Sequence, residues 1–86
     1  MKHAGLSALD RLEDLLAEIR THAELREKKQ GVFYRKSKAF LHFHEDPAGL
    51  LADIRGGHDF DRFPVNTGKE QEELLMHIGS LLSDGT

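Results

Sequence analysis

The stretch "FLHFHEDP", residues 40–47, contains the side chains of this chain that are best suited to chemistry. His42 and His44 lie two positions apart in an apolar run, and on a β-strand such a pair shares one face at a spacing of roughly 7 Å. Two imidazoles at this spacing can bind one metal ion if other residues complete the site. The candidate ligands are therefore His42, His44, His58 and Asp61. Two histidines and a carboxylate suit zinc or iron with an open coordination position.

The same residues also have a purely structural interpretation. No motif such as H-E-x-x-H fixes a third ligand, so the histidines can equally be surface, interface or hydrogen-bonded sheet residues. Asp46 and Pro47 have the pattern of a helix start, an aspartate cap followed by proline in the first turn. The chain has no G-x-S-x-G motif, no P-loop and no G-x-G-x-x-G motif. The sequence favours a protein that is not an enzyme and has no cofactor, with zinc or iron as the alternative.

Apolar spacing predicts the elements that must position these residues. Leucine and isoleucine at three- and four-residue steps predict an amphipathic helix over 7–29, with Gly31 as its stop. The segments "VFYRK" and "KAFLHFHE" then change to a period of two. This change predicts an antiparallel hairpin that turns at Lys36 and Ser37.

The remaining sequence predicts two further helices and one short strand. A short helix is expected over 47–55, a brief strand over 58–63 near the edge-favouring Pro64, and a helix over 68–83 capped by Thr67 and Glu70. The predicted order is α-β-β-α-β-α. The chain is thus expected to be one small α+β domain spanning 1–86, with helices on one face of a hairpin or three-stranded sheet.

Alternation along the hairpin assigns its side chains to two faces. The expected core set is Val32, Tyr34, Ala39, Leu41 and Phe43. The expected open set is Phe33, Arg35, Phe40, His42 and His44. Because aromatic residues on an uncovered sheet usually mark an interface, the leading hypothesis is a binding or self-association module, a homodimer or a complex with another protein.

The charge distribution suggests a second alternative. Residues 26–38 hold six lysine or arginine residues against Glu27 alone, a formal charge of +5 in a chain of net charge −3. A basic hairpin with aromatic neighbours could bind single-stranded nucleic acid weakly. The excess of negative charge outside this segment would repel a phosphate backbone, which argues against that function.

Absences in the sequence bear on location. The chain has no cysteine, so it has no disulfide and no thiolate metal site, and the cytoplasm is the expected compartment. The N-terminal residues reach Asp10 before any apolar run of signal-peptide length. No run approaches the roughly 18 apolar residues of a membrane span, so no membrane association is expected.

A resemblance adds to this interpretation. The run "GVFYRKSKAFLHFHEDPAGLLADIR", followed by "FDRFPV" and a capped C-terminal helix, resembles a group of small bacterial proteins without an assigned activity. The similar region spans roughly residues 31–82, and "FYRKSKAFLHFHED" is its distinctive part. The resemblance implies a small bacterial cytoplasmic domain and no catalytic or ligand residues.

Overall fold

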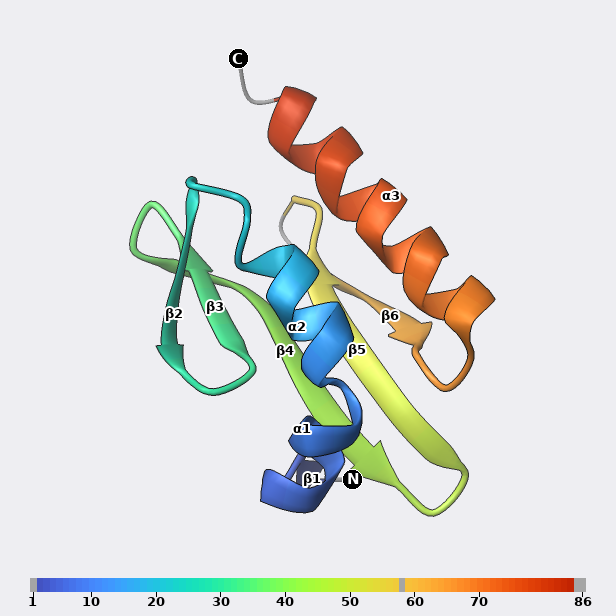
Figure 1. Cartoon of the computed structure of the whole chain (residues 1–86). Coiled ribbons are helices and arrows are strands. Elements are labelled where there is room, and N and C mark those ends of the chain that lie inside the picture. Colours follow the sequence, from blue (N-terminus) through green and yellow to red (C-terminus); the bar gives the residue numbers. More distant parts are fainter. Residues whose placement is uncertain (1, 58, 85–86) are drawn as a thin grey trace.

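The computed structural model describes residues 2–57 and 59–84, and it shows an antiparallel sheet with its helices on one face (Figure 1). The sheet has six strands in the order β2-β3-β4-β5-β6, and β1 pairs with β4. The elements in chain order are β1 (Lys2–His3), α1 (Leu6–Arg11), α2 (Glu13–Ile19), β2 (Leu25–Lys29), β3 (Val32–Arg35), β4 (Lys38–Asp46), β5 (Gly49–Arg55), β6 (Phe60–Pro64) and α3 (Gly68–Asp84). The α+β class is as predicted, whereas the predicted order of elements is wrong.

The first helix is much shorter than the predicted 7–29. Helix α2 ends at Ile19, and the charged segment from Leu25 becomes the edge strand β2. Leu25 packs against the core and Glu27 is half-buried, whereas Arg26 and Lys28 are exposed, so this segment buries alternate residues as a strand does. Tertiary packing therefore overrides the helix propensity of this charged run.

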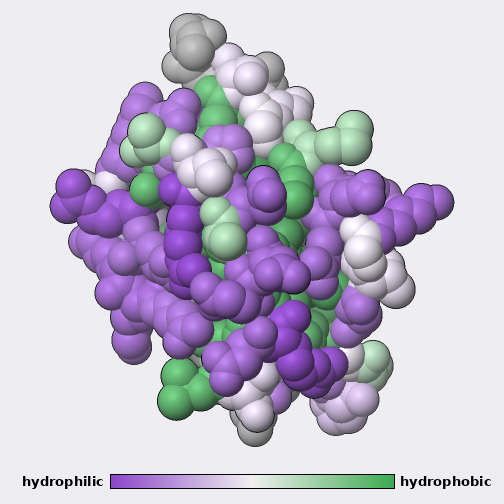
Figure 2. All heavy atoms as spheres, viewed as in Figure 1, coloured by the Kyte–Doolittle hydropathy of each residue, from purple (hydrophilic) through white to green (hydrophobic). Residues whose placement is uncertain are grey.

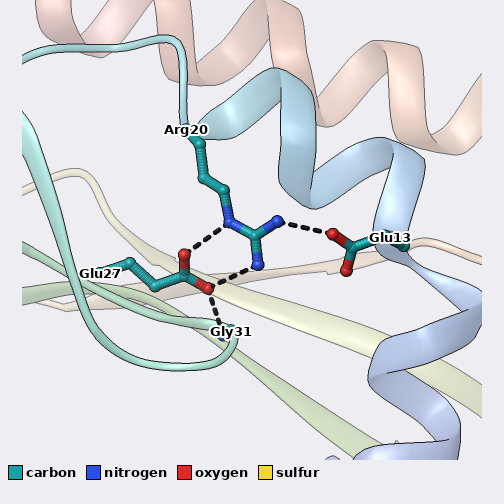
Figure 3. Close-up of polar contacts among 4 residues, drawn as sticks. All are labelled: Glu13, Arg20, Glu27 and Gly31. Atoms are coloured by element: carbon teal, nitrogen blue, oxygen red, sulfur yellow. Dashed lines mark hydrogen bonds and ion pairs between the residues drawn. The ribbon is translucent and has the colours of Figure 1, made fainter.

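A charged cluster holds β2 beside α2 (Figure 3). Arg20, just after α2, binds Glu13 at 2.7 Å through one terminal nitrogen and Glu27 at 2.6 Å through Nε. Glu27 also accepts a hydrogen bond from the backbone N–H of Gly31 in the next turn. Gly31 has φ +80° and lies against Leu9, so it serves a hairpin turn and not the predicted helix end.

The predicted helix over 47–55 is strand β5. Asp46 accepts a hydrogen bond from the backbone N–H of Ala48, a contact that closes the two-residue turn between β4 and β5. Beyond this turn Leu50, Ala52 and Ile54 are buried with the helices, at every second position. Asp46 and Pro47 therefore begin a hairpin turn and not a helix.

The turn between β3 and β4 lies where it was predicted. Lys36 and Ser37 have φ of 52° and 70°, and Arg35 pairs with Lys38. A bulge follows, because Tyr34 pairs with Ala39 whereas Phe33 pairs with Leu41.

This bulge corrects the predicted faces. Phe33 and Phe40 belong to the core, with 1% and 3% of their surface exposed, and Arg35 shares the helix-covered face with Phe33. Val32, expected in the core, instead pairs with His42 on the open face, and Tyr34 shares that face with it.

The C-terminal half confirms two further predictions. Strand β6 is an edge strand that ends at Pro64. Thr67 Oγ1 accepts from the backbone N–H of Glu70, while Glu70 Oε1 accepts from that of Thr67, the reciprocal capping box that starts α3. Within residues 2–57 and 59–84 no helix is long and apolar enough to cross a membrane. Figure 2 shows mostly hydrophilic side chains over the helix-covered side.

Candidate functional site

The candidate site lies on the sheet face that the helices leave uncovered. Leu41 and Phe43 of β4 point into the core, so His42 and His44 must project from the opposite face. In the register of β4 with β5, His42 lies opposite Asp53. The alternation of both strands therefore brings two imidazoles and one carboxylate together on the open face.

His42, His44 and Asp53 form one tight cluster, called the HHD cluster below. Each residue offers a nitrogen or oxygen ligand atom, and no two of these atoms are more than 4.8 Å apart. Nε2 of His44 lies 2.9 Å from Oδ2 of Asp53, and the two imidazole rings meet edge-on at 4.7 Å. The side chains of His44 and Asp53 are only 13% and 10% exposed, so water is largely excluded from their contact.

These distances can be compared with those of a metal site. Bonds of about 2.1 Å place adjacent ligand atoms about 3.0 to 3.4 Å apart and opposite ones about 4.2 Å apart. The 2.9 Å between His44 and Asp53 is close to the spacing of an adjacent pair. All three ligand atoms lie within 4.8 Å of one another, so a bound ion would have to draw the more distant of them closer. The HHD cluster can therefore hold one divalent ion.

Arg62 of β6 is the main competitor for the carboxylate. It lies opposite Asp53 in the β5–β6 register and donates to both of its oxygens, at 2.8 Å and 3.0 Å. These hydrogen bonds hold the pKa of Asp53 below its ordinary value, and burial opposes them only in part. The carboxylate is ionised at neutral pH, as a metal ligand must be, but it already has a cationic partner.

An aromatic side chain closes one side of the cluster. The ring of Phe60 lies edge-on to His42 at 5.0 Å, and the guanidinium of Arg55 stacks over Phe60 at 4.7 Å. Arg55 also donates from Nε to the backbone carbonyl of Ala39 at 2.9 Å. Phe60 therefore shields His42 and lowers the local dielectric around the cluster.

The structure brings together only part of the predicted ligand set. His42 and His44 share a face as expected, and His58 lies outside the described residues. Asp61 pairs with Ile54 and so faces the helices, away from the two histidines. Asp53 takes the place predicted for Asp61.

The sequence pattern does not indicate Asp53, because it predicts a helix over residues 47–55. One signal could have found it, since Ala52 and Ile54 flank Asp53 with apolar side chains in strand alternation. The predicted interface is also changed. Phe33, Phe40 and Arg35 lie on the other side of the sheet from the histidines, so only His42 and His44 of that set remain on the open face.

The resemblance carried by "FYRKSKAFLHFHED" stays a prediction. It implies no activity, so it gives His42 and His44 no role. Any chemistry at the HHD cluster is therefore argued from its geometry. Comparison of the chain with protein-family models, with curated proteins and with solved structures found no match.

Proposed function

We propose that this protein binds one divalent transition-metal ion through His42, His44 and Asp53. The observation that carries the proposal is the convergence of three ligand atoms within 4.8 Å on one sheet face. They come from two neighbouring strands of a continuous ladder, which makes their spacing rigid. A rigid set of ligands loses little conformational entropy when the ion binds.

The ligand set selects the kind of ion. Two imidazoles and one carboxylate favour zinc or ferrous iron over calcium or magnesium, which prefer oxygen ligands alone. All three ligands reach the ion from the sheet, so its far side is left for water or another molecule. An open position is the arrangement that catalytic sites keep and structural zinc sites lack.

Arg62 competes with a metal ion for the carboxylate of Asp53. Without metal its guanidinium neutralises Asp53, and a bound ion must share or replace that contact. A bound ion also repels the guanidinium, because both are cations close to the same carboxylate. Metal binding is therefore expected to release Arg62 from Asp53.

The test is a titration of untagged, chelator-treated protein with Zn²⁺ and Co²⁺, followed by calorimetry and visible absorption. The expected result is one ion bound per chain and a visible absorption spectrum typical of cobalt with nitrogen and oxygen ligands. His44→Ala should weaken binding by roughly a hundredfold. His22→Ala, which removes a histidine outside the cluster, should bind as the wild type does.

Two results would contradict the proposal. One is a wild-type protein that binds neither ion at high micromolar concentration. The other is equal binding by His44→Ala and the wild type, which would place the ion elsewhere.

Self-association through the open face stays a prediction. Its two aromatic anchors, Phe33 and Phe40, are buried in the core of the chain itself and cannot contact a second copy. Leu6 of α1 and Met76 of α3 are the large apolar side chains that stand exposed among the described residues, and both lie on helices and not on the open face.

A further inference from the structure

A cavity of about 470 Å³ lies at one end of the sheet, next to the turn between β3 and β4. Its other walls are the end of β5, the residues after it, and Leu81 of α3. The side chains that matter for its chemistry are Arg35, Lys36, Lys38, Phe40, Arg55 and Leu81. We infer that this cavity binds a small phosphate monoester with an apolar group.

The charge of the cavity is the first argument. Four cationic side chains line it, and no aspartate or glutamate is among the described residues that do so. The carboxylate of Asp61 approaches the wall at Gly56, where a Cβ would lie 3.5 Å from its Oδ2, but the four cations still leave the cavity with an excess of positive charge. Four cations around one cavity repel one another, and an anion with two negative charges would relieve that repulsion.

Arg35 is the second argument. Its Nε is buried and has no hydrogen-bond partner among the described residues. A buried donor without a partner costs stability, and a guanidinium is the side chain best shaped to bind a phosphate through two hydrogen bonds. A phosphate in the cavity would supply the missing acceptor.

Arg55 is the third argument. Its hydrogen bond to the carbonyl of Ala39 and its position over Phe60 hold the guanidinium at the wall of the cavity. The bond from Nε uses one of five N–H donors. Arg55 is therefore ordered before a ligand arrives, which lowers the entropy lost on binding.

The walls also explain why the ligand should carry an apolar group. Leu81 provides apolar surface beside the four cations, as do the aliphatic stems of the lysine and arginine side chains, whereas Phe40 is almost fully buried behind them. Gly56 and Gly57 bring backbone without side chains to the same wall, and a Cβ on Gly57 would meet nothing within 4 Å. The volume and this mixed lining suit a phosphorylated small molecule better than a bare inorganic ion.

This inference does not depend on the proposed metal function. None of the residues that line the cavity belongs to the HHD cluster. The two sites are neighbours, because Arg55 of the cavity stacks over Phe60, which lies against His42. Each site has its own ligand-binding residues and its own test, so failure of one proposal would not decide the other.

The experiment is an NMR titration of the full chain with phenyl phosphate, with phenol and inorganic phosphate as parallel probes. Phenyl phosphate should shift the backbone amides of Gly56 and Gly57 and saturate at low millimolar concentration. Phenol should cause no shift, and inorganic phosphate should bind more weakly at the same amides.

Two matched variants locate the site. Lys36→Gln/Lys38→Gln removes two exposed cations of the cavity and should weaken phenyl phosphate binding about fivefold. Lys29→Gln/Lys69→Gln removes the same charge away from the cavity and should bind as the wild type does.

Three results would overturn the inference. The first is the absence of shifts at Gly56 and Gly57 at roughly 10 mM phenyl phosphate, a concentration at which even millimolar binding saturates. The second is equal binding by the two double variants. The third is tighter, strongly salt-dependent binding of an oligothymidylate, which would assign the cavity to nucleic acid.

Discussion

Nε2 of His44 on β4 lies 2.9 Å from Oδ2 of Asp53 on β5, and the same carboxylate receives two hydrogen bonds from Arg62 on β6. One aspartate thus joins three neighbouring strands on the open face. This arrangement makes Asp53 the residue on which the proposed metal function depends most. Substitution of Arg62 therefore best distinguishes a metal site from a cluster of charges that only stabilises the fold.

Arg62→Met should increase the affinity for Zn²⁺ by about tenfold or more, because it removes a cation that competes for Asp53. Without metal the same variant should be less stable, since the buried carboxylate loses its partner. Calorimetry would measure the affinity and thermal unfolding the stability. Arg26→Met, an exposed arginine on the edge strand β2, is the control of equal charge. Unchanged or weaker zinc binding by Arg62→Met would indicate that Asp53 is not a ligand.

Asp53→Asn and Asp61→Asn should differ in their effect on zinc binding. Asp53→Asn removes the carboxylate of the HHD cluster and should weaken zinc binding by roughly a hundredfold. Asp61 faces the helices, so its substitution should leave zinc binding unchanged. A zinc titration of both variants distinguishes the ligand that the structure places in the cluster from the one that the sequence predicted. Loss of binding in Asp61→Asn alone would contradict the observed register of β5 with β6.

Glu27 should make the stability of the fold dependent on pH. The hydrogen bonds from Arg20, together with the one from Gly31, hold the pKa of Glu27 below its ordinary value of about 4.3 (Figure 3). Because its pKa is lower in the folded state, ionised Glu27 stabilises the fold, and this stabilisation is complete at pH values above the ordinary pKa. The stabilisation is lost as pH falls through the lowered pKa.

Glu27→Gln should therefore lower the free energy of unfolding by about 1 to 2 kcal/mol at pH 7, and the difference should shrink as pH falls below the ordinary pKa of a glutamate. Urea unfolding at a series of pH values measures this difference. Glu24→Gln, an exposed glutamate just before β2, is the control and should have little effect at any pH. A difference between Glu27→Gln and the wild type that is independent of pH would show that the contact with Arg20 is not ionic.

Phe33→Ala tests the corrected face of β3. Phe33 is almost fully buried, so its truncation should lower the free energy of unfolding by about 3 to 4 kcal/mol. Val32→Ala on the adjacent open-face position should cost clearly less, because Val32 is only half-buried. Urea unfolding compares the two variants. If Phe33 were instead an interface residue, Phe33→Ala would reduce self-association, measured by light scattering, without reducing stability.

Some features of the site follow from local sequence alone. His42 and His44 share a face in any strand, because side chains alternate with a period of two. The capping box of Thr67 and Glu70 starts α3 from contacts within one turn, so it too could be predicted. The turn at Lys36 and Ser37 is equally local.

Other features were decided only by the tertiary structure. The segment "AGLLADIR" contains apolar residues at spacings that fit a short helix or a strand, and its pairing with β4 settles the choice. The third ligand, Asp53, depends on that pairing. The faces of Phe33 and Phe40 depend on a bulge of one residue, which no periodicity reveals. The alternation of side chains along a strand thus determines that His42 and His44 share one face. Strand pairing decides that Asp53 lies beside them and that Arg62 contacts Asp53.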